Sequence, residues 1–175
     1  MPVVTDTMLL RYLIEIEVVQ ILPHLFTQVI IPPAVARELD HPHAPAVVRT
    51  WMAAPPVWLR LRQPALPHDP GLRRLHAGEQ EALLLMMEHA APLLLTDDGE
   101  AYKIALARQI PVVRTLRLLT TAATQDLIDL PTVLRRLDAT TFYMPREVVA
   151  VMLAQDAARK AAAPQPPTDP EETAR

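Results

Sequence analysis

The sequence predicts an α/β fold in which helices cover both faces of a central, mostly parallel sheet. Short, largely apolar runs at residues 3–4, 28–31 and 93–95 have the length and composition of buried strands. Between these runs, apolar residues recur at three- and four-residue spacings, as they do in amphipathic helices. Because strands and helices alternate along the chain, the connections suit a parallel sheet.

The size of the chain indicates a single domain. It has 175 residues, half of them hydrophobic, which is enough to bury a substantial core. We assign residues 1–160 to this domain. Residues 161–175 hold four prolines and mixed charge, and we expect them to form a disordered tail.

The first half of the chain predicts three strands. Residues 3–4 form the first, and a helix follows from Thr7, with apolar residues at Leu10, Leu13, Ile14 and Val18, until Pro23 interrupts. Residues 28–31 form the second strand, and Pro33 starts a helix that includes Glu38. After a loop at 40–45 and a helix at 46–52, residues 57–62 alternate apolar and other side chains, with Val57, Leu59 and Leu61 on the apolar face. This pattern predicts an edge strand with one exposed face.

The second half begins with the most strongly helical segment, residues 79–89, which follows Gly78. Its apolar face is formed by Ala82, Leu83, Met86 and Met87, so we interpret both methionines as core. Further expected elements are a strand at 93–95, a helix at 100–108, a strand at 111–113 and helices at 115–124, 129–137 and 145–160. The last helix carries Val148, Val149, Met152 and Leu153 on one face, which docks on its own domain or on a partner.

Missing residue types narrow the possible chemistry. The chain has no Cys, Ser or Asn and only three glycines, which excludes thiolate zinc sites, serine triads and glycine-rich phosphate loops. The net charge of −3 argues against a surface coated with basic charge for nonspecific nucleic-acid binding. No 18-residue apolar run or charged-then-apolar leader is present, so we expect a cytoplasmic protein without a membrane segment. Carboxylates, with a hard metal ion, remain the favoured chemistry.

Acidic residues stand where the predicted strands and helices meet. Asp6 follows the first strand, Asp97 and Asp98 follow the strand at 93–95, and Glu38, Glu79 and Glu81 lie on helices near the same edge. Each acid alone is more commonly a helix cap or a partner of the helix dipole. Together, at the carboxyl edge of a parallel sheet, they predict a cleft that binds Mg²⁺ or Mn²⁺. Such a site activates water for an in-line phosphoryl displacement.

Five short segments resemble, in order and spacing, the signatures of PIN-domain proteins. They are residues 4–7, 29–33 with 37–39, 78–82, 94–98 and 115–116, and the resemblance extends over about residues 3–155. The similarity is greatest to a bacterial and archaeal branch of PIN-like proteins related to the VapC-type toxin ribonucleases.

The resemblance implies a three-layer α/β/α PIN fold and a Mg²⁺- or Mn²⁺-dependent endoribonuclease that cleaves single-stranded RNA, as the toxin of a toxin–antitoxin pair. An antitoxin protein and a homodimer are the implied protein partners. Carried over by position, Asp6 is the first acid, Glu38 the second and Glu79 the third, while Asp97 and Asp98 both fit the fourth. The implied metal ligands are Asp6, Glu79 and Asp97 or Asp98. Glu81 is a nearby spare, and Thr7 or Thr115 holds a ligand or a metal-bound water.

Two places depart from the pattern of this branch. Arg114 and Arg117 flank Thr115 where the branch usually has glycines, and Ala101-Tyr102 replaces a usual Gly-Arg pair. Arg114 either contacts a phosphate or blocks the close approach that glycine allows. These departures motivate an alternative function: a non-catalytic PIN-like module that binds RNA or a protein partner.

Overall fold

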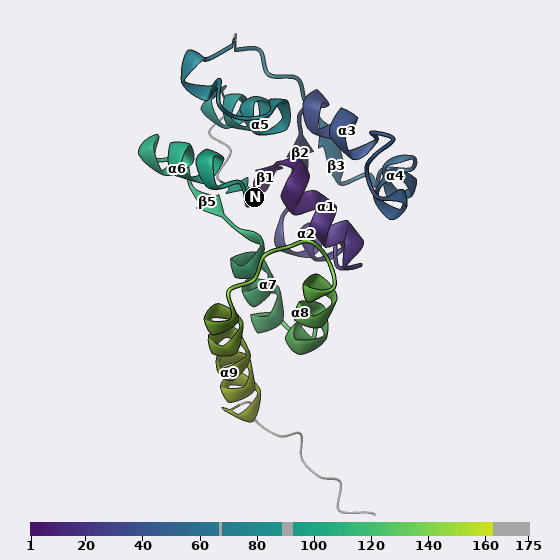
Figure 1. Ribbon diagram of the computed structural model, residues 1–175, viewed down its shortest axis with the longest axis vertical. Helices are drawn as coiled ribbons and strands as arrows, with labels where there is room; N and C mark the ends of the chain where they lie inside the picture. Colours follow the sequence, from purple (N-terminus) through teal and green to yellow (C-terminus); the bar gives the residue numbers. More distant parts are fainter. Residues whose placement is uncertain (67, 89–92, 163–175) are drawn as a thin grey trace, which may run out of the picture.

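The centre of the molecule is a five-stranded sheet in which all neighbouring strands are parallel (Figure 1). The computed structural model describes residues 1–66, 68–88 and 93–162. The strand order is β3-β2-β1-β4-β5, and the strands are β1 Pro2–Thr5, β2 Gln28–Ile31, β3 Leu59–Leu61, β4 Leu94–Leu95 and β5 Val112–Val113. The predicted α/β class and parallel sheet are confirmed. Residues 163–175 of the expected tail and His89 of the central helix lie outside the described residues.

Helices connect the strands and complete the two outer layers. In the described part of the chain they are α1 Thr7–Glu15, α2 Ile21–Leu25, α3 Pro33–Leu39, α4 Ala46–Met52, α5 Ala77–Glu88, α6 Gly99–Ala107, α7 Thr115–Thr124, α8 Leu130–Asp138 and α9 Arg146–Ala162. A short 3₁₀ helix, Pro70–Leu72, precedes α5. None of these helices is long and apolar enough to cross a membrane.

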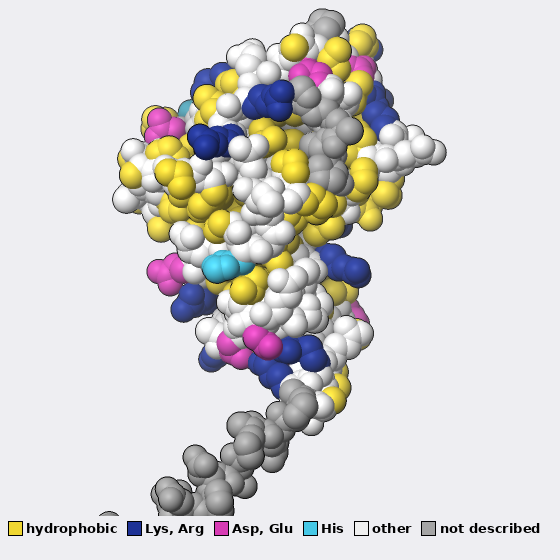
Figure 2. All heavy atoms as spheres, turned by 180° about the vertical axis from the view of Figure 1, so that it is seen from behind, with side chains coloured by type: hydrophobic (Ala, Val, Ile, Leu, Met, Phe, Trp, Pro, Cys, Tyr) yellow, Lys and Arg dark blue, Asp and Glu magenta, His cyan; other side chains and the backbone are white. Residues whose placement is uncertain are grey.

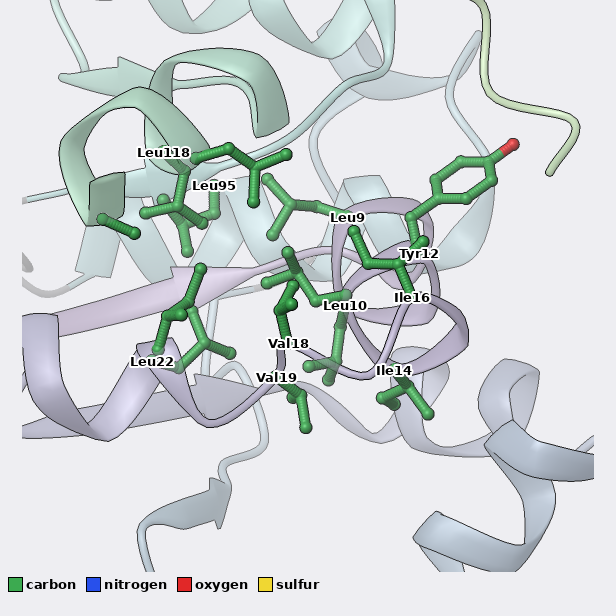
Figure 3. Packing of buried hydrophobic residues seen from close by; sticks show 14 of the residues in the cluster. Leu9, Leu10, Tyr12, Ile14, Ile16, Val18, Val19, Leu22, Leu95 and Leu118 are labelled. Atoms are coloured by element: carbon green, nitrogen blue, oxygen red, sulfur yellow. The ribbon is translucent and has the colours of Figure 1, made fainter. Parts of the chain in front are cut away.

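Alternating strand residues supply two separate hydrophobic cores, because successive side chains of a strand point to opposite faces. Val3, Val29 and Leu95 belong to the larger core, which also holds side chains of α1, α7 and α8. Figure 3 shows Leu9 and Leu10 of α1 among the packed side chains of this core. On the other face, Val4, Ile30 and Leu94 pack with side chains of α5 and α6. The strands β1, β2 and β4 are therefore covered on both sides, which explains their largely apolar sequences.

The middle of the sheet determines where a ligand can bind. β1 pairs with β2 on one side and with β4 on the other, with Thr5 opposite Leu95 in the register. The connections leave β1 and β4 toward opposite faces, which makes this pair the topological switch point of the sheet. Ligands of open α/β proteins bind outside the carboxyl ends of strands at such a point. Asp6 and Asp97, which follow these two strands, are placed there by the topology.

The first helix is shorter than its apolar pattern predicts. α1 ends at Glu15 and does not include Val18, because Glu17 adopts a left-handed conformation with φ of 59°. The Val18 N–H then donates to the Leu13 carbonyl at 2.9 Å, which closes the helix in a Schellman motif. The prediction that Pro23 interrupts a helix is wrong, because Pro23 lies inside α2. A proline is tolerated there because the first turn of a helix needs no intrahelical N–H donor.

Two predictions about exposure are wrong. β3 is an edge strand as predicted, but Val57 and Leu61 of the expected apolar face are 85% and 64% exposed. Instead Trp58 packs against the larger core, with its ring centroid 5.9 Å from that of Trp51. On α5, Met86 is buried but Met87 is exposed, and the Met87 sulfur contacts the Arg108 guanidinium.

The last helix docks on its own chain. Val149, Met152 and Leu153 of α9 face the larger core, while Val148 is exposed. The helix runs to Ala162, two residues into the segment expected to be a tail. A charged network ties its end to the loop between α7 and α8, and Figure 2 shows acidic and basic side chains adjoining one another there. The network consists of Asp126, Asp129, Asp156, Arg159 and Lys160.

Candidate active site

Asp6 is a buried carboxylate with one oxygen bonded and one free. It is the N-cap of α1, and its Oδ1 accepts a hydrogen bond from the Leu9 N–H at 3.0 Å. Its Oδ2 is buried and has no hydrogen-bond partner. Burial raises the pKa of Asp6 to about 7, and the negative charges of Glu79 and Asp97 add to the rise, while the nearby Thr96 hydroxyl and the Leu9 N–H act to lower it. Capping therefore explains one oxygen of this side chain and leaves the other unexplained.

Glu79, in the first turn of α5, repeats this pattern. The residue is 6% exposed, and its Oε2 is buried without a hydrogen-bond partner. Burial raises its pKa, as do the negative charges of Glu38 and Asp98, while its own backbone N–H and His76 act to lower it. Two elements that are far apart in the sequence thus each carry a buried carboxylate oxygen without a partner.

Glu38 links the ends of three helices. Its Oε2 accepts a hydrogen bond from the Thr7 hydroxyl of α1, and its Oε1 accepts one from the Gly78 N–H of α5 at 3.0 Å. The glycine permits this approach, because a Cβ at position 78 would lie 2.7 Å from Glu38 Oε2. Glu38 and Glu79 both line a groove of about 380 Å³, together with Thr7, Met8, Arg11, Tyr12 and His76.

Asp97 and Asp98 have different hydrogen-bond partners, which distinguishes their positions in the site. Asp97 is 8% exposed, and its Oδ1 and Oδ2 accept hydrogen bonds from the N–H and the hydroxyl of Thr115, at 3.0 and 2.5 Å. Burial raises the pKa of Asp97, although the two Thr115 hydrogen bonds and Arg114 act to lower it. Asp98 is the N-cap of α6, where its Oδ1 accepts hydrogen bonds from the N–H groups of Glu100 and Ala101 at 2.9 and 2.7 Å.

Glu81 serves another element. Its Oε2 accepts a hydrogen bond from the Ala34 N–H at 2.8 Å, and its Oε1 lies 3.6 Å from Arg37. The side chain therefore holds the N-terminus of α3, whose first residues lack a side-chain cap of their own. Among the acids singled out from the sequence, Asp6, Glu38, Glu79, Asp97 and Asp98 are joined by contacts or by charge, whereas Glu81 anchors a helix. We call those five residues the acidic cluster.

The sequence interpretation missed neighbours of this cluster. Thr5 and Thr96 are fully buried at the ends of β1 and β4, each directly before an acid of the cluster. Their repeated Thr-Asp pairing at two strand ends is a signal that the sequence contains. His76 and Arg11 line the groove without any such signal, since no short-range pattern relates them to the acids.

The residues present fit a divalent cation. Within the described residues, no group of three or more His, Cys, Asp or Glu side chains is already arranged to hold a metal ion. The cluster nevertheless contains two buried carboxylate oxygens without partners, and its charges raise the pKa values of its own members. Buried carboxylates of this kind need a cation or a proton, and an all-oxygen donor set suits Mg²⁺ or Mn²⁺.

The fold and the acidic cluster define a doubly wound α/β protein with a carboxylate site at its switch point. A family model described as a PIN domain matches residues 2–157. The chain belongs to the PIN-domain family. PIN domains are usually nucleases, generally use divalent metal ions and commonly bind RNA. Neither the curated proteins nor the solved structures compared with this chain include a match.

Proposed function

We propose that this protein is a Mg²⁺- or Mn²⁺-dependent endoribonuclease that cleaves phosphodiester bonds of single-stranded RNA. The observation that carries the proposal is the pair of buried, partnerless oxygens, Asp6 Oδ2 and Glu79 Oε2. A buried polar atom without a partner is costly, so each one calls for an explanation, such as a catalytic role or a bound ion. Family membership supports nuclease chemistry for these carboxylates.

Each member of the acidic cluster takes a distinct role in this proposal. Asp6 and Glu79 hold the cation, and Asp98 adds negative charge beside Glu79. Glu38 is held by Thr7 and Gly78 at the groove, where its carboxylate orients the attacking water. Asp97 is held by Thr115 and adds negative charge near Asp6. When bound, a divalent cation supplies Lewis-acid stabilisation of the phosphate charge and makes water a better nucleophile.

Titration of Mn²⁺ into metal-stripped protein, followed by an RNA cleavage assay, tests the proposal. Asp6→Asn is the decisive variant, because asparagine keeps an oxygen for the Leu9 N–H but removes the charge. We expect this variant to lose both Mn²⁺ binding and cleavage and to keep the wild-type circular dichroism spectrum. Asp129→Asn is the matched control, since Asp129 is also an N-cap that accepts a backbone hydrogen bond, but at α8. It should bind Mn²⁺ and cleave like the wild type.

Two results would contradict this function. If Asp6→Asn cleaves RNA as well as the wild type does, the acidic cluster is not required for the reaction. A wild type that binds single-stranded RNA, but neither binds Mn²⁺ nor cleaves the RNA, favours the non-catalytic PIN-like module. This is the alternative that the replaced glycines motivate.

The role as a toxin, its antitoxin and the homodimer stay predictions from the family resemblance. An apolar groove of about 520 Å³ between α8 and α9, lined by residues such as Leu134, Met144 and Val149, offers a surface for a protein partner. Light scattering of the purified protein tests the homodimer. Growth arrest on expression, relieved by Asp6→Asn, tests the toxin role.

A further inference from the structure

Arg114 places a guanidinium group beside the acidic cluster. It is the N-cap residue of α7, directly after β5, and its Nε lies 3.8 Å from Asp97 Oδ1. Its Nη2 donates a hydrogen bond to the Asp97 carbonyl at 3.0 Å. Of the ion pairs among the described residues, Asp97–Arg114 is the one that includes a member of the acidic cluster.

Tyr102 holds this guanidinium from a second side. The Cζ of Arg114 lies 5.6 Å from the centroid of the Tyr102 ring, within the range of a cation–π interaction. Tyr102 is on α6, and Arg114 follows β5, so two elements fix the position of the guanidinium. Both residues stand where the related branch usually has other residue types. The two departures are therefore in contact in the structure and form a cation–π pair beside Asp97.

The members of the acidic cluster differ in whether the protein itself satisfies their carboxylate oxygens. Asp97 has both carboxylate oxygens hydrogen-bonded by Thr115 and a positive charge next to one of them. Asp6 and Glu79 each keep a buried oxygen that nothing in the protein satisfies. Within the described residues an ion pair thus joins Arg114 to Asp97, whereas none of the ion pairs there includes Asp6 or Glu79.

We propose that Arg114 replaces a second divalent cation, so that the acidic cluster takes one divalent cation, at Asp6 and Glu79. This inference rests on the proposed function, because it concerns the same site. A second divalent cation on Asp97 would lie against the positive charge of the Arg114 guanidinium, which repels it. The guanidinium has five N–H donors, one of which bonds the Asp97 carbonyl, and the side chain is 52% exposed. Its remaining donors can bind a non-bridging oxygen of the RNA phosphate.

The number of Mn²⁺ ions bound per chain tests the inference, measured by isothermal titration and by electron paramagnetic resonance of metal-stripped protein. We expect one Mn²⁺ for the wild type. Arg114→Gln should gain a second, weaker Mn²⁺, because no positive charge then lies beside the Asp97 carboxylate. Adding Asp97→Asn to that variant should return the number to one. Arg117→Gln is the matched control, since Arg117 lies on the same helix and is also exposed, and it should keep one Mn²⁺.

The outcomes separate this inference from the proposed function. Two Mn²⁺ ions on the wild type, or a single one on Arg114→Gln, overturn the role of Arg114 and leave the nuclease proposal standing. A wild type that binds no Mn²⁺ overturns both. Circular dichroism of Arg114→Gln establishes that the variant is folded, which is expected because the half-exposed Arg114 side chain does not cap α7.

Discussion

Asp6 combines a structural task with an unsatisfied oxygen, and other members of the acidic cluster also serve the fold. Asp6 caps α1 with one oxygen and leaves the other buried and free. Asp98 likewise caps α6, and Glu38 bonds two donors from other helices. A carboxylate that is fixed through one oxygen presents the other in a defined place, which suits the binding of a cation. The capping and functional interpretations of these acids are thus compatible.

Gly78→Ala should damage the site more than the fold. The added Cβ would lie 2.7 Å from Glu38 Oε2 and 2.9 Å from Thr7 Oγ1, so the flexible Glu38 side chain must move. Alanine also favours the helix, so we expect the free energy of unfolding to change by about 1 kcal/mol or less. Loss of an orienting contact typically lowers metal affinity or activity about 10- to 100-fold, and we expect that loss in Mn²⁺ titrations and RNA cleavage.

Gly99→Ala is the control for this prediction. Gly99 begins α6, and a Cβ there meets no atom within 4 Å. This variant should bind Mn²⁺ and cleave RNA like the wild type. Equal losses in both variants would show that Gly78 has no special relation to Glu38.

At the scale of elements, three helices end in the same way without glycine. Glu17, Gln109 and Asp126 follow α1, α6 and α7 with φ of 59°, 57° and 55°. In each case the next N–H donates back into the last turn, as the Ile110 N–H does to the Ala105 carbonyl at 2.9 Å. Glycine and asparagine, the usual residues in this conformation, are rare or absent in this chain. These helix ends were therefore hard to recognise from the sequence.

Gln109→Gly should stabilise the protein. A residue with a Cβ is strained in the left-handed conformation, and glycine is not, so the free energy of unfolding should rise by about 1 kcal/mol in urea denaturation. Gln109 is exposed, which leaves few other contacts to lose. Ala107→Gly, two residues earlier in the last turn of α6, should lower it by about 1 kcal/mol. A loss of stability in Gln109→Gly would show that strain at this position is negligible.

For the whole molecule, the titration of the acidic cluster predicts an unusual pH dependence. The folded protein raises the pKa of Asp6 from 3.8 to about 7. Between these values the unfolded chain has lost its proton and the folded protein has kept it, so the free energy of unfolding falls as the pH rises. The raised pKa values of Glu79 and Asp97 act in the same direction. Without a divalent cation, the protein should therefore be less stable at pH 8 than at pH 5.

Other carboxylates determine how the free energy of unfolding changes at acidic pH. The Thr132 and Lys160 hydrogen bonds lower the pKa of Asp129 to about 2, and the Arg108 and Gly71 hydrogen bonds lower that of Asp69. Their contributions to stability are present above pH 3.8 and disappear as the pH falls below it. The stability maximum in EDTA should thus lie near pH 4 to 5, between the two sets of titrations.

Thermal unfolding in EDTA between pH 3 and 9 measures this profile. Asp6→Asn should flatten the fall between pH 4 and 7, since its neutral amide does not titrate, and should be more stable than the wild type at pH 8. Each unit of raised pKa corresponds to about 1.4 kcal/mol. Mn²⁺ should raise the wild-type midpoint at pH 8 and have little effect on Asp6→Asn. An unchanged slope in Asp6→Asn would show that Asp6 is not the titrating group.

Local sequence patterns were sufficient for the class of fold and for most of its elements. The buried strand Gln28–Ile31 and the helix Ala46–Met52 were predicted with their bounds, and the helix Pro33–Leu39 with its start, because apolar periodicity and proline positions act over a few residues. The placement of acids at strand ends also followed, since parallel strands bring their carboxyl ends to one edge of the sheet.

Hydrogen-bond partners that are distant in the sequence decided the rest. Asp97 is held by Thr115, and Glu38 by Gly78, 18 and 40 residues away along the chain. Glu81 is drawn to the N-terminus of α3 by the Ala34 N–H, 47 residues away. No local pattern encodes these pairings, because they arise only when packed helices bring their ends together. The sequence thus determines which carboxylates the site contains. Tertiary packing determines that two of their buried oxygens, Asp6 Oδ2 and Glu79 Oε2, have no hydrogen-bond partner in the protein.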